Sequence, residues 1–193
     1  MSDLVFIDIE TTGLISGYHE IIEIAIIYED GTEYYHKIKP NRLELADPRA
    51  LSINRFTSKA WRNAIEPAQL AYDLSEILKD KIIVGHNPHF DIEFIEDLLH
   101  KYDQPCLWKR RYVDTITLAF EHLKPLGLTS CSLDECRRFF KWSTVFSHTA
   151  LQDAKDCRRL YYKLARASSF KRFSWLLWPK IKSFMKILEK GYY

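Results

Sequence analysis

No apolar stretch in this sequence approaches the roughly 18 consecutive residues that a membrane-spanning helix requires. The first ten residues, MSDLVFIDIE, carry acids where a secretory signal peptide has a basic start and a long apolar run. Four cysteines show neither the density of a disulfide scaffold nor a zinc-binding pattern with the nearest histidines. These absences favour a soluble, cytoplasmic protein with reduced thiols and no transmembrane segment.

Internal repeats and low-complexity linkers are also absent, so nothing divides the chain into tethered domains. A chain of 193 residues that is 47% hydrophobic can bury one substantial core and is short for two full domains. The net charge of +2 is unevenly placed, because residues 168–193 hold six Lys or Arg and one Glu, whereas the rest holds 22 basic and 25 acidic residues. We expect one domain over 1–167 and a basic tail over 168–193.

The expected secondary structure is that of an α/β protein. Three strands are predicted at 4–9, 21–28 and 32–38 from apolar runs, and Asp30-Gly31 is a hairpin signal between the last two. From residue 67 helix and strand patterns alternate, which implies parallel pairing. The expected elements there are helix 67–79, strand 81–85, helix 90–102, strand 111–114, helix 116–123, and two helices that begin with the capping boxes 132–135 and 149–152.

Acidic residues stand at three informative places in this pattern. Asp8 and Glu10 share a strand, so their side chains point the same way about 7 Å apart. Buried together they would need a cation such as a metal, although exposure at a strand end or pairing with Lys or Arg would explain them equally. Asp91 begins a helix, where an acid also simply favours the helix dipole. His148 and Asp153 flank another helix start, and each could be a solvated surface residue.

Taken together, these residues have the composition that phosphodiester hydrolysis with two divalent metal ions requires. Carboxylates hold such ions, and an uncharged imidazole can take a proton from the attacking water.

Three ordered motifs resemble those of the DnaQ-like exonucleases of the DEDDh superfamily. DxETTGL is matched at 8–14, HNxxFD at 86–91 and HxALxDA at 148–154. The resemblance covers roughly residues 3–167. It implies a ribonuclease H-like α/β fold, with a mixed five-stranded sheet flanked by helices, and metal-dependent 3′-to-5′ exonuclease activity on nucleic-acid 3′ ends.

The resemblance also implies roles for individual side chains. Asp8, Glu10, Asp91 and Asp153 would hold two Mg²⁺ or Mn²⁺ ions, with Asp8 bridging both. Four negative charges balance two divalent ions, and without metal the acids would raise one another's pKa. His148 would be the general base, and the product would be a nucleoside monophosphate.

The segment after Glu10 is expected to meet the substrate. By the resemblance, the backbone of Thr11, Thr12 and Gly13 and the side chain of Leu14 would contact the terminal nucleotide, with Leu14 wedged against its base. Phe90 is interpreted as core packing beneath the acid that follows it.

Four further residues are set aside. Asp114 resembles a structural position of the family, and Asp156 lies where the family does not demand an acid. Asn54 stands where a histidine is often found, which weakens any expectation of substrate contacts from 50–57, including stacking by Trp61.

Alternatives remain open at this level. ETTG in place of the EMTG of oligoribonucleases favours DNA, while an RNA-trimming exonuclease and a catalytically idle module that binds nucleic-acid ends or a polymerase are the rivals. The tail combines an apolar stripe with basic residues, so it is either a terminal helix packed on the domain or a site for nucleic acid, a partner protein or an anionic surface. The residues of this pattern are Phe170, Phe173, Leu177, Ile181, Phe184 and Leu188 with Lys171, Arg172, Lys180, Lys182, Lys186 and Lys190.

Overall fold

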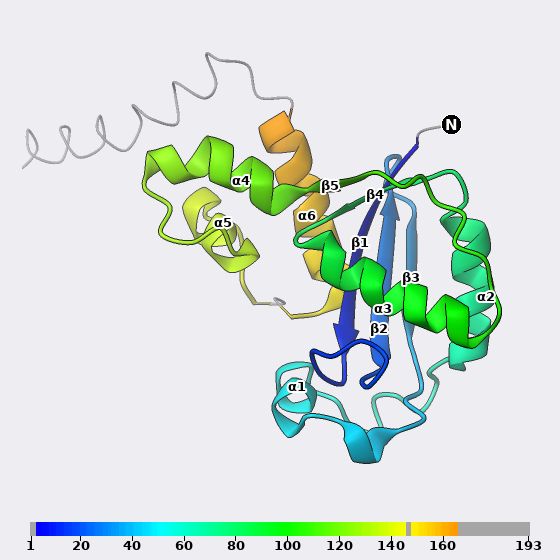
Figure 1. The fold of residues 1–193 in the computed structure, drawn as a ribbon. Helices are drawn as coiled ribbons and strands as arrows, with labels where there is room; N and C mark the ends of the chain where they lie inside the picture. The colour runs from blue at the N-terminus through cyan, green and yellow to red at the C-terminus, as the bar shows by residue number, and fades with distance from the viewer. Residues whose placement is uncertain (1–2, 146–147, 166–193) are drawn as a thin grey trace, which may run out of the picture.

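The computed structural model describes residues 3–145 and 148–165, so the predicted tail at 168–193 lies outside the described residues. One five-stranded sheet forms the centre of the fold, with strand order β3-β2-β1-β4-β5 (Figure 1). β1 pairs antiparallel with β2 and parallel with β4, which confirms the predicted mixed sheet. The strands are β1 (Leu4–Thr11), β2 (Ile21–Tyr28), β3 (Glu33–Lys37), β4 (Ile82–Gly85) and β5 (Tyr112–Asp114).

Helices cover both faces of this sheet. Figure 1 shows α3 in front of the strands, α2 at the right of the sheet and α6 behind the strands, with α4 and α5 beside α6. The α-helices are α1 (Pro48–Ile53), α2 (Pro67–Ile77), α3 (Pro88–Lys101), α4 (Thr115–Leu123), α5 (Leu133–Phe140) and α6 (Ala150–Ala165). Two short 3₁₀ helices, Leu43–Leu45 and Lys124–Leu126, were not predicted from the sequence. Within the described ranges no helix is long and apolar enough to cross a membrane.

The alternation of side chains along β1 decides which residues meet α6. Val5, Ile7 and Ile9 face the core that α2 and α3 complete, and Phe6 faces the opposite core, which includes Ala154 of α6. Because side chains repeat every two residues in a strand, the even-numbered acids of β1 lie on the α6 face. The strand pattern therefore places them on the side from which α6 approaches.

Element boundaries differ from the sequence predictions by a few residues. β1 continues to Thr11 rather than ending at residue 9, because it keeps pairing with β2 as far as Ile21, past a register shift after Glu10. α3 begins at Pro88 rather than residue 90, with the ring at the first helical position, where its missing N–H costs nothing. All four cysteines are free.

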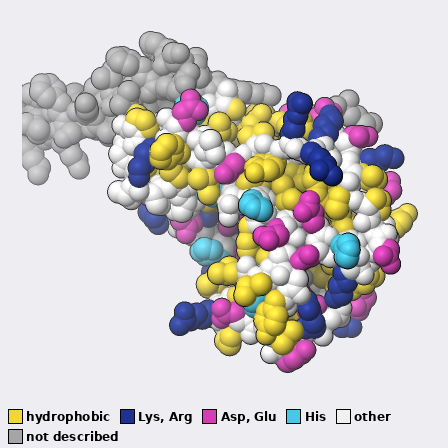
Figure 2. Space-filling model, in the orientation of Figure 1, with side chains coloured by type: hydrophobic (Ala, Val, Ile, Leu, Met, Phe, Trp, Pro, Cys, Tyr) yellow, Lys and Arg dark blue, Asp and Glu magenta, His cyan; other side chains and the backbone are white. Residues whose placement is uncertain are grey.

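Charged side chains are unevenly distributed over the face drawn in Figure 2. Acidic side chains and histidines mix over α3, whereas Lys and Arg gather at the upper right of the view, over the segment that leads into β5. That segment carries Lys109, Arg110 and Arg111, of which Lys109 pairs with Asp3 at 2.6 Å.

Candidate active site

Three of the predicted metal ligands form a compact carboxylate cluster. Asp8 and Glu10 of β1 and Asp153 of α6 each offer an oxygen, and these oxygens lie within 4.8 Å of one another. Asp153 reaches the cluster because α6 begins just before it, where the Gln152 N–H donates to Thr149 Oγ1 at 3.4 Å and the Asp153 N–H donates to the Thr149 carbonyl at 3.0 Å. Segments far apart in the chain thus place acids on one small surface.

The fourth predicted ligand, Asp91, lies against the same strand. It is buried in the first turn of α3, and its Oδ1 accepts a hydrogen bond from the Ile9 N–H at 3.0 Å. This bond holds the Asp91 carboxylate against the backbone between Asp8 and Glu10, and the charge of Asp91 raises the pKa of both acids. Asp91 is not one of the three residues whose oxygens lie within 4.8 Å of one another, but it bonds the same strand and its charge acts on Asp8.

The acids strongly disfavour one another's ionisation. Burial, followed by repulsion from Asp91, Asp153 and Glu10, raises the pKa of Asp8 well above its usual range. Burial raises the pKa of Glu10 to about 8, with repulsion from Asp153 adding to it, and burial raises the pKa of Asp91 to about 8. A hard divalent cation would offset both the burial of the carboxylate charges and the repulsion between them, so the donor set fits Mg²⁺ or Mn²⁺.

These shifts predict how metal affects stability as pH changes. Folded pKa values near 8, against ordinary values of 3.8 to 4.5, mean that the metal-free fold binds more protons than the unfolded chain. The stability contributed by the acids is therefore present at low pH and is lost as pH rises towards 8. Mg²⁺ should raise the melting temperature more at pH 8 than at pH 6, and calorimetry in buffers of different ionisation enthalpy should show proton release on binding. An equal gain at both pH values, without proton release, would contradict this.

His148 lies at the rim of the cluster rather than inside it. Its backbone is left-handed, with φ of 63°, and its side chain is 53% exposed. The Nε2 atom is 3.7 Å from Asp134 Oδ2, too long for a hydrogen bond but close enough for attraction when the ring is protonated. The charge of His148 also acts on Asp153. An exposed imidazole beside the acids is accessible to both substrate and water.

The predicted nucleotide-binding segment combines buried threonines with an exposed leucine. Thr11 and Thr12 are buried and bonded internally: Thr11 Oγ1 donates to the Gly13 carbonyl at 2.6 Å, and Thr12 Oγ1 accepts from the Glu20 N–H at 2.9 Å. Leu14, in contrast, is 79% exposed. The threonine side chains therefore shape the turn, while Leu14 presents an apolar side chain to solvent.

Gly13 is needed for close packing in this turn. A Cβ on Gly13 would overlap the ring of His19, whose Nδ1 accepts the Ile15 N–H at 3.0 Å. Gly13→Ala should displace His19, break that bond and move Leu14. We expect KM for a short oligonucleotide to rise about tenfold or more while the melting temperature stays within a few degrees. Gly31→Ala in the β2–β3 hairpin is the control for backbone strain away from this turn: Gly31 has φ of 95°, so the change should lower the melting temperature and leave KM unchanged. An unchanged KM for Gly13→Ala would show that the turn does not meet substrate.

The residues that sequence analysis set aside have internal partners. Asn54 is buried and donates from Nδ2 to the Thr11 carbonyl at 2.9 Å, and buried Trp61 donates from Nε1 to the Ile22 carbonyl at 2.8 Å. Trp61 is therefore a core residue rather than an exposed stacking platform. Asp114 caps α4 by accepting the Ile116 N–H at 2.8 Å.

Sequence analysis missed two charged residues beside the cluster. Glu23 of β2 is buried opposite Glu10 in the sheet, and its charge contributes to the raised pKa of Glu10. The one acid within the apolar run 21–28 was a usable signal. Arg137 of α5 is buried and bonds Asp153 directly, with Nη2 to Oδ1 at 2.7 Å. No feature of the sequence marked this arginine.

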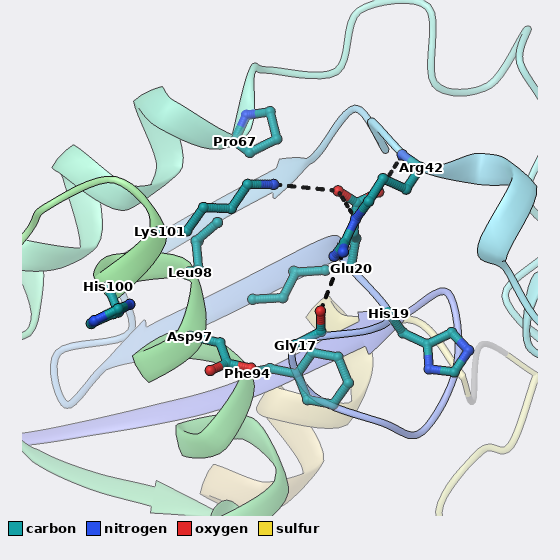
Figure 3. A pocket seen from close by; sticks show the side chains of 11 residues that line it. Gly17, His19, Glu20, Arg42, Pro67, Phe94, Asp97, Leu98, His100 and Lys101 are labelled. Atoms are coloured by element: carbon teal, nitrogen blue, oxygen red, sulfur yellow. Dashed lines mark hydrogen bonds and ion pairs between the residues drawn. The ribbon is translucent and has the colours of Figure 1, made fainter.

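A separate pocket of about 340 Å³ lies between the 17–21 segment and α3 (Figure 3). Glu20 in this pocket is fully engaged: its carboxylate accepts from the Arg42 N–H at 2.7 Å and pairs with Lys101 at 3.8 Å. None of the predicted metal, catalytic or nucleotide-contacting residues lines the pocket. Its charged groups hold the 17–21 segment against its neighbours.

The strand order, the helices on both faces and the acid cluster at the β1–α6 contact define a ribonuclease H-like nuclease domain. Residues 5–161 match the RNase_T family, described as exonuclease, so the chain belongs to this exonuclease family.

Curated relatives and solved structures resemble this chain to different degrees. The chain is 32% identical to a PolC-type DNA polymerase III of Thermotoga maritima over 82% of its own length and 12% of the relative's. It is 28% identical to a DNA polymerase III subunit epsilon of Treponema pallidum, over 80% of this chain and 72% of that one. The structure of E. coli exonuclease I in complex with a dA16 oligonucleotide superposes with a TM-score of 0.74 and 20% identity, covering 90% of this chain and 42% of that chain. This structural likeness concerns the fold.

Proposed function

We propose that this domain is a metal-dependent 3′-to-5′ exonuclease of the DEDDh type that releases nucleoside monophosphates, preferentially from DNA. The observation that carries the proposal is the meeting of Asp8, Glu10 and Asp153 within 4.8 Å, with Asp91 against the same strand and His148 at the rim. Burial raises the pKa of all four carboxyls, and repulsion from neighbouring acids adds to the shifts of Asp8 and Glu10. Because these shifts persist although Arg137 bonds Asp153, the cluster still lacks positive charge that a metal ion would supply.

Each side chain has a distinct task in this proposal. Asp8, Glu10, Asp91 and Asp153 would hold two Mg²⁺ or Mn²⁺ ions, which when bound supply charge stabilisation and lower the pKa of water. His148, accessible at the rim, would take the proton of the attacking water. Carboxylates that hold the ions would be weaker bases than His148, because the positive charge of the metal lowers their pKa.

Substrate binding would use the exposed apolar edge of the turn after β1. Leu14 is 79% exposed, so its side chain can pack against the last base. The turn beneath it is held by buried threonines and by Asn54, which favours a preformed contact over one that must be ordered on binding.

DNA is the favoured substrate on two grounds. The ETTG sequence differs from the EMTG of oligoribonucleases, and the relatives in the comparison are DNA polymerase III proteins. The chain spans only 12% of the length of the PolC-type relative, so a proofreading role with a polymerase partner is a separate prediction. The RNA-trimming alternative and the idle binding module are distinguished by experiment.

The experiment uses three 5′-labelled substrates of one sequence: single-stranded DNA, duplex DNA and RNA, each incubated with Mg²⁺ or Mn²⁺. We expect a ladder that shortens from the 3′ end, fastest on DNA, and no products in EDTA. Faster shortening of RNA would favour the trimming alternative. Binding without any shortening would favour the idle module and overturn the proposal.

The tail at 168–193 is proposed to support docking rather than chemistry, because it adds positive charge and no residue of the acid cluster. Truncation before Ser168 should leave turnover of a very short oligonucleotide within about twofold, while weakening binding to a long strand, a partner or an anionic surface. For a nucleic-acid strand this loss should be largest at low salt. A large fall in melting temperature together with loss of all activity would instead assign the tail to the core.

A further inference from the structure

We propose that Arg137 is a positioning residue of the acid cluster, which fixes Asp153 for ion binding and links it to the helix beside His148. This inference rests on the proposed function, because it assigns a role toward the ions that the cluster would hold. It concerns a residue outside the three motifs, on a different helix from the ligand that it contacts.

The guanidinium of Arg137 is held by three carboxylates. Its side chain is 1% exposed, and its Nη2, Nη1 and Nε atoms lie 2.7, 2.7 and 2.8 Å from Asp153, Asp134 and Asp156 respectively. Asp134 belongs to α5 itself, whereas the other two acids belong to α6. A planar fork with a separate nitrogen for each partner cannot rotate without breaking at least one bond.

Arg137 bonds only one of the two carboxylate oxygens of Asp153. Arg137 occupies Oδ1, so the other oxygen of Asp153 stays available to an ion. A carboxylate with one oxygen anchored has lost its rotational freedom before any ion arrives. Ligands that are fixed by supporting hydrogen bonds bind metal more tightly than ligands that must be ordered on binding.

The same guanidinium is connected to the predicted general base, His148, through Asp134. Asp134 Oδ1 accepts a hydrogen bond from Arg137, and Asp134 Oδ2 lies 3.7 Å from His148 Nε2. Arg137 is therefore the common neighbour of a proposed ligand and of the acid that faces the proposed base. Among the described residues, Arg137 is the arginine or lysine that forms ion pairs with Asp153 and with Asp134.

A cation beside a metal site could also compete with the metal, so the two effects must be weighed. Arg137 shares its single positive charge among three aspartates, and the four groups together keep two negative charges. The guanidinium therefore does not neutralise Asp153. The charge of Arg137 is divided among three acids, while its geometry is fixed. We therefore expect its positioning of Asp153 to strengthen metal binding more than its positive charge weakens it.

The test compares Arg137→Met and Arg137→Lys with the wild type, using Arg138→Met as the control because Arg138 is exposed on the same helix. Mn²⁺ binding is measured by electron paramagnetic resonance on the folded proteins, alongside the Mn²⁺ dependence of turnover. Both Arg137 variants should bind at least one ion 10- to 100-fold more weakly. Saturating Mn²⁺ should recover much of the turnover. Lysine should not restore affinity, because one ammonium cannot bridge all three acids.

Three outcomes would overturn the proposal. Unchanged Mn²⁺ affinity with a lowered melting temperature would make Arg137 purely structural, and tighter binding would make it a competitor of the metal. If Arg137→Met does not fold, the double variant Arg137→Gln/Asp156→Asn replaces the buried charges of one ion pair by two amides. The Mn²⁺ affinity of this double variant is then compared with that of the wild type, and the same outcomes apply. A wild type that neither binds Mn²⁺ nor cleaves would defeat the proposed function itself, whereas variants that match an active wild type would defeat only the role of Arg137.

Discussion

Asp8→Asn should reduce exonuclease turnover by at least about 100-fold, more than the loss of a merely supporting residue at a metal site usually costs. The amide keeps the size of the side chain but removes the central charge of the cluster, which Asp91, Asp153 and Glu10 all influence. For the same reason the variant should be more stable than the wild type in EDTA at pH 8. Relief of repulsion should raise the melting temperature even as activity disappears.

This combination separates loss of a metal ligand from loss of the fold. Asp103→Asn is the matched control, because Asp103 is exposed just after α3 and belongs to none of the motifs. It should leave both activity and melting temperature unchanged. A double Asp8→Asn/Glu10→Asn protein that still degraded DNA and RNA at the wild-type rate would refute the assignment of the site.

His148→Ala should slow cleavage by about 10² to 10⁴-fold, the usual contribution of a general base. Its side chain lies at the rim, 53% exposed, and the oxygens of the proposed ligand trio come from other residues. Mn²⁺ affinity should therefore change by no more than a few fold. The measurements are single-turnover cleavage at saturating metal and Mn²⁺ binding on the same preparation.

The control for this variant is His100→Ala, since His100 is exposed in the last turn of α3 and lines the separate pocket. It should cleave at the wild-type rate. If His148→Ala lost metal binding, His148 would be a ligand rather than a base. Unchanged turnover would give it no role in the chemistry.

The fold could be predicted largely from local patterns. Apolar runs and the Asp30-Gly31 hairpin signal predicted the first three strands, and the helix–strand alternation after residue 67 predicted the parallel half of the sheet. Where the observed ends of an element differ from the predicted ones, contacts with other parts of the fold are the cause. β1 runs on to Thr11 because β2 offers it partners, and no pattern within β1 could reveal that.

The proximity of the predicted ligands was inferred through a resemblance rather than from spacing. Period-2 alternation put Asp8 and Glu10 on one face, but only the packing of α6 against that face brings Asp153 to them. Arg137 shows the limit of this reasoning. A surface arginine and a buried one look alike in a capped amphipathic helix, and only the folded chain shows that three acids surround it.

The most direct test of the central claim is anomalous diffraction at the manganese edge from crystals soaked in Mn²⁺. A peak should appear between the carboxylates of Asp8, Glu10 and Asp153, on the Asp153 oxygen that Arg137 leaves available, with a second ion reached by Asp91. It should be absent from Asp8→Asn crystals. Saturating Mn²⁺ bound elsewhere, with no density among these carboxylates, would contradict the account.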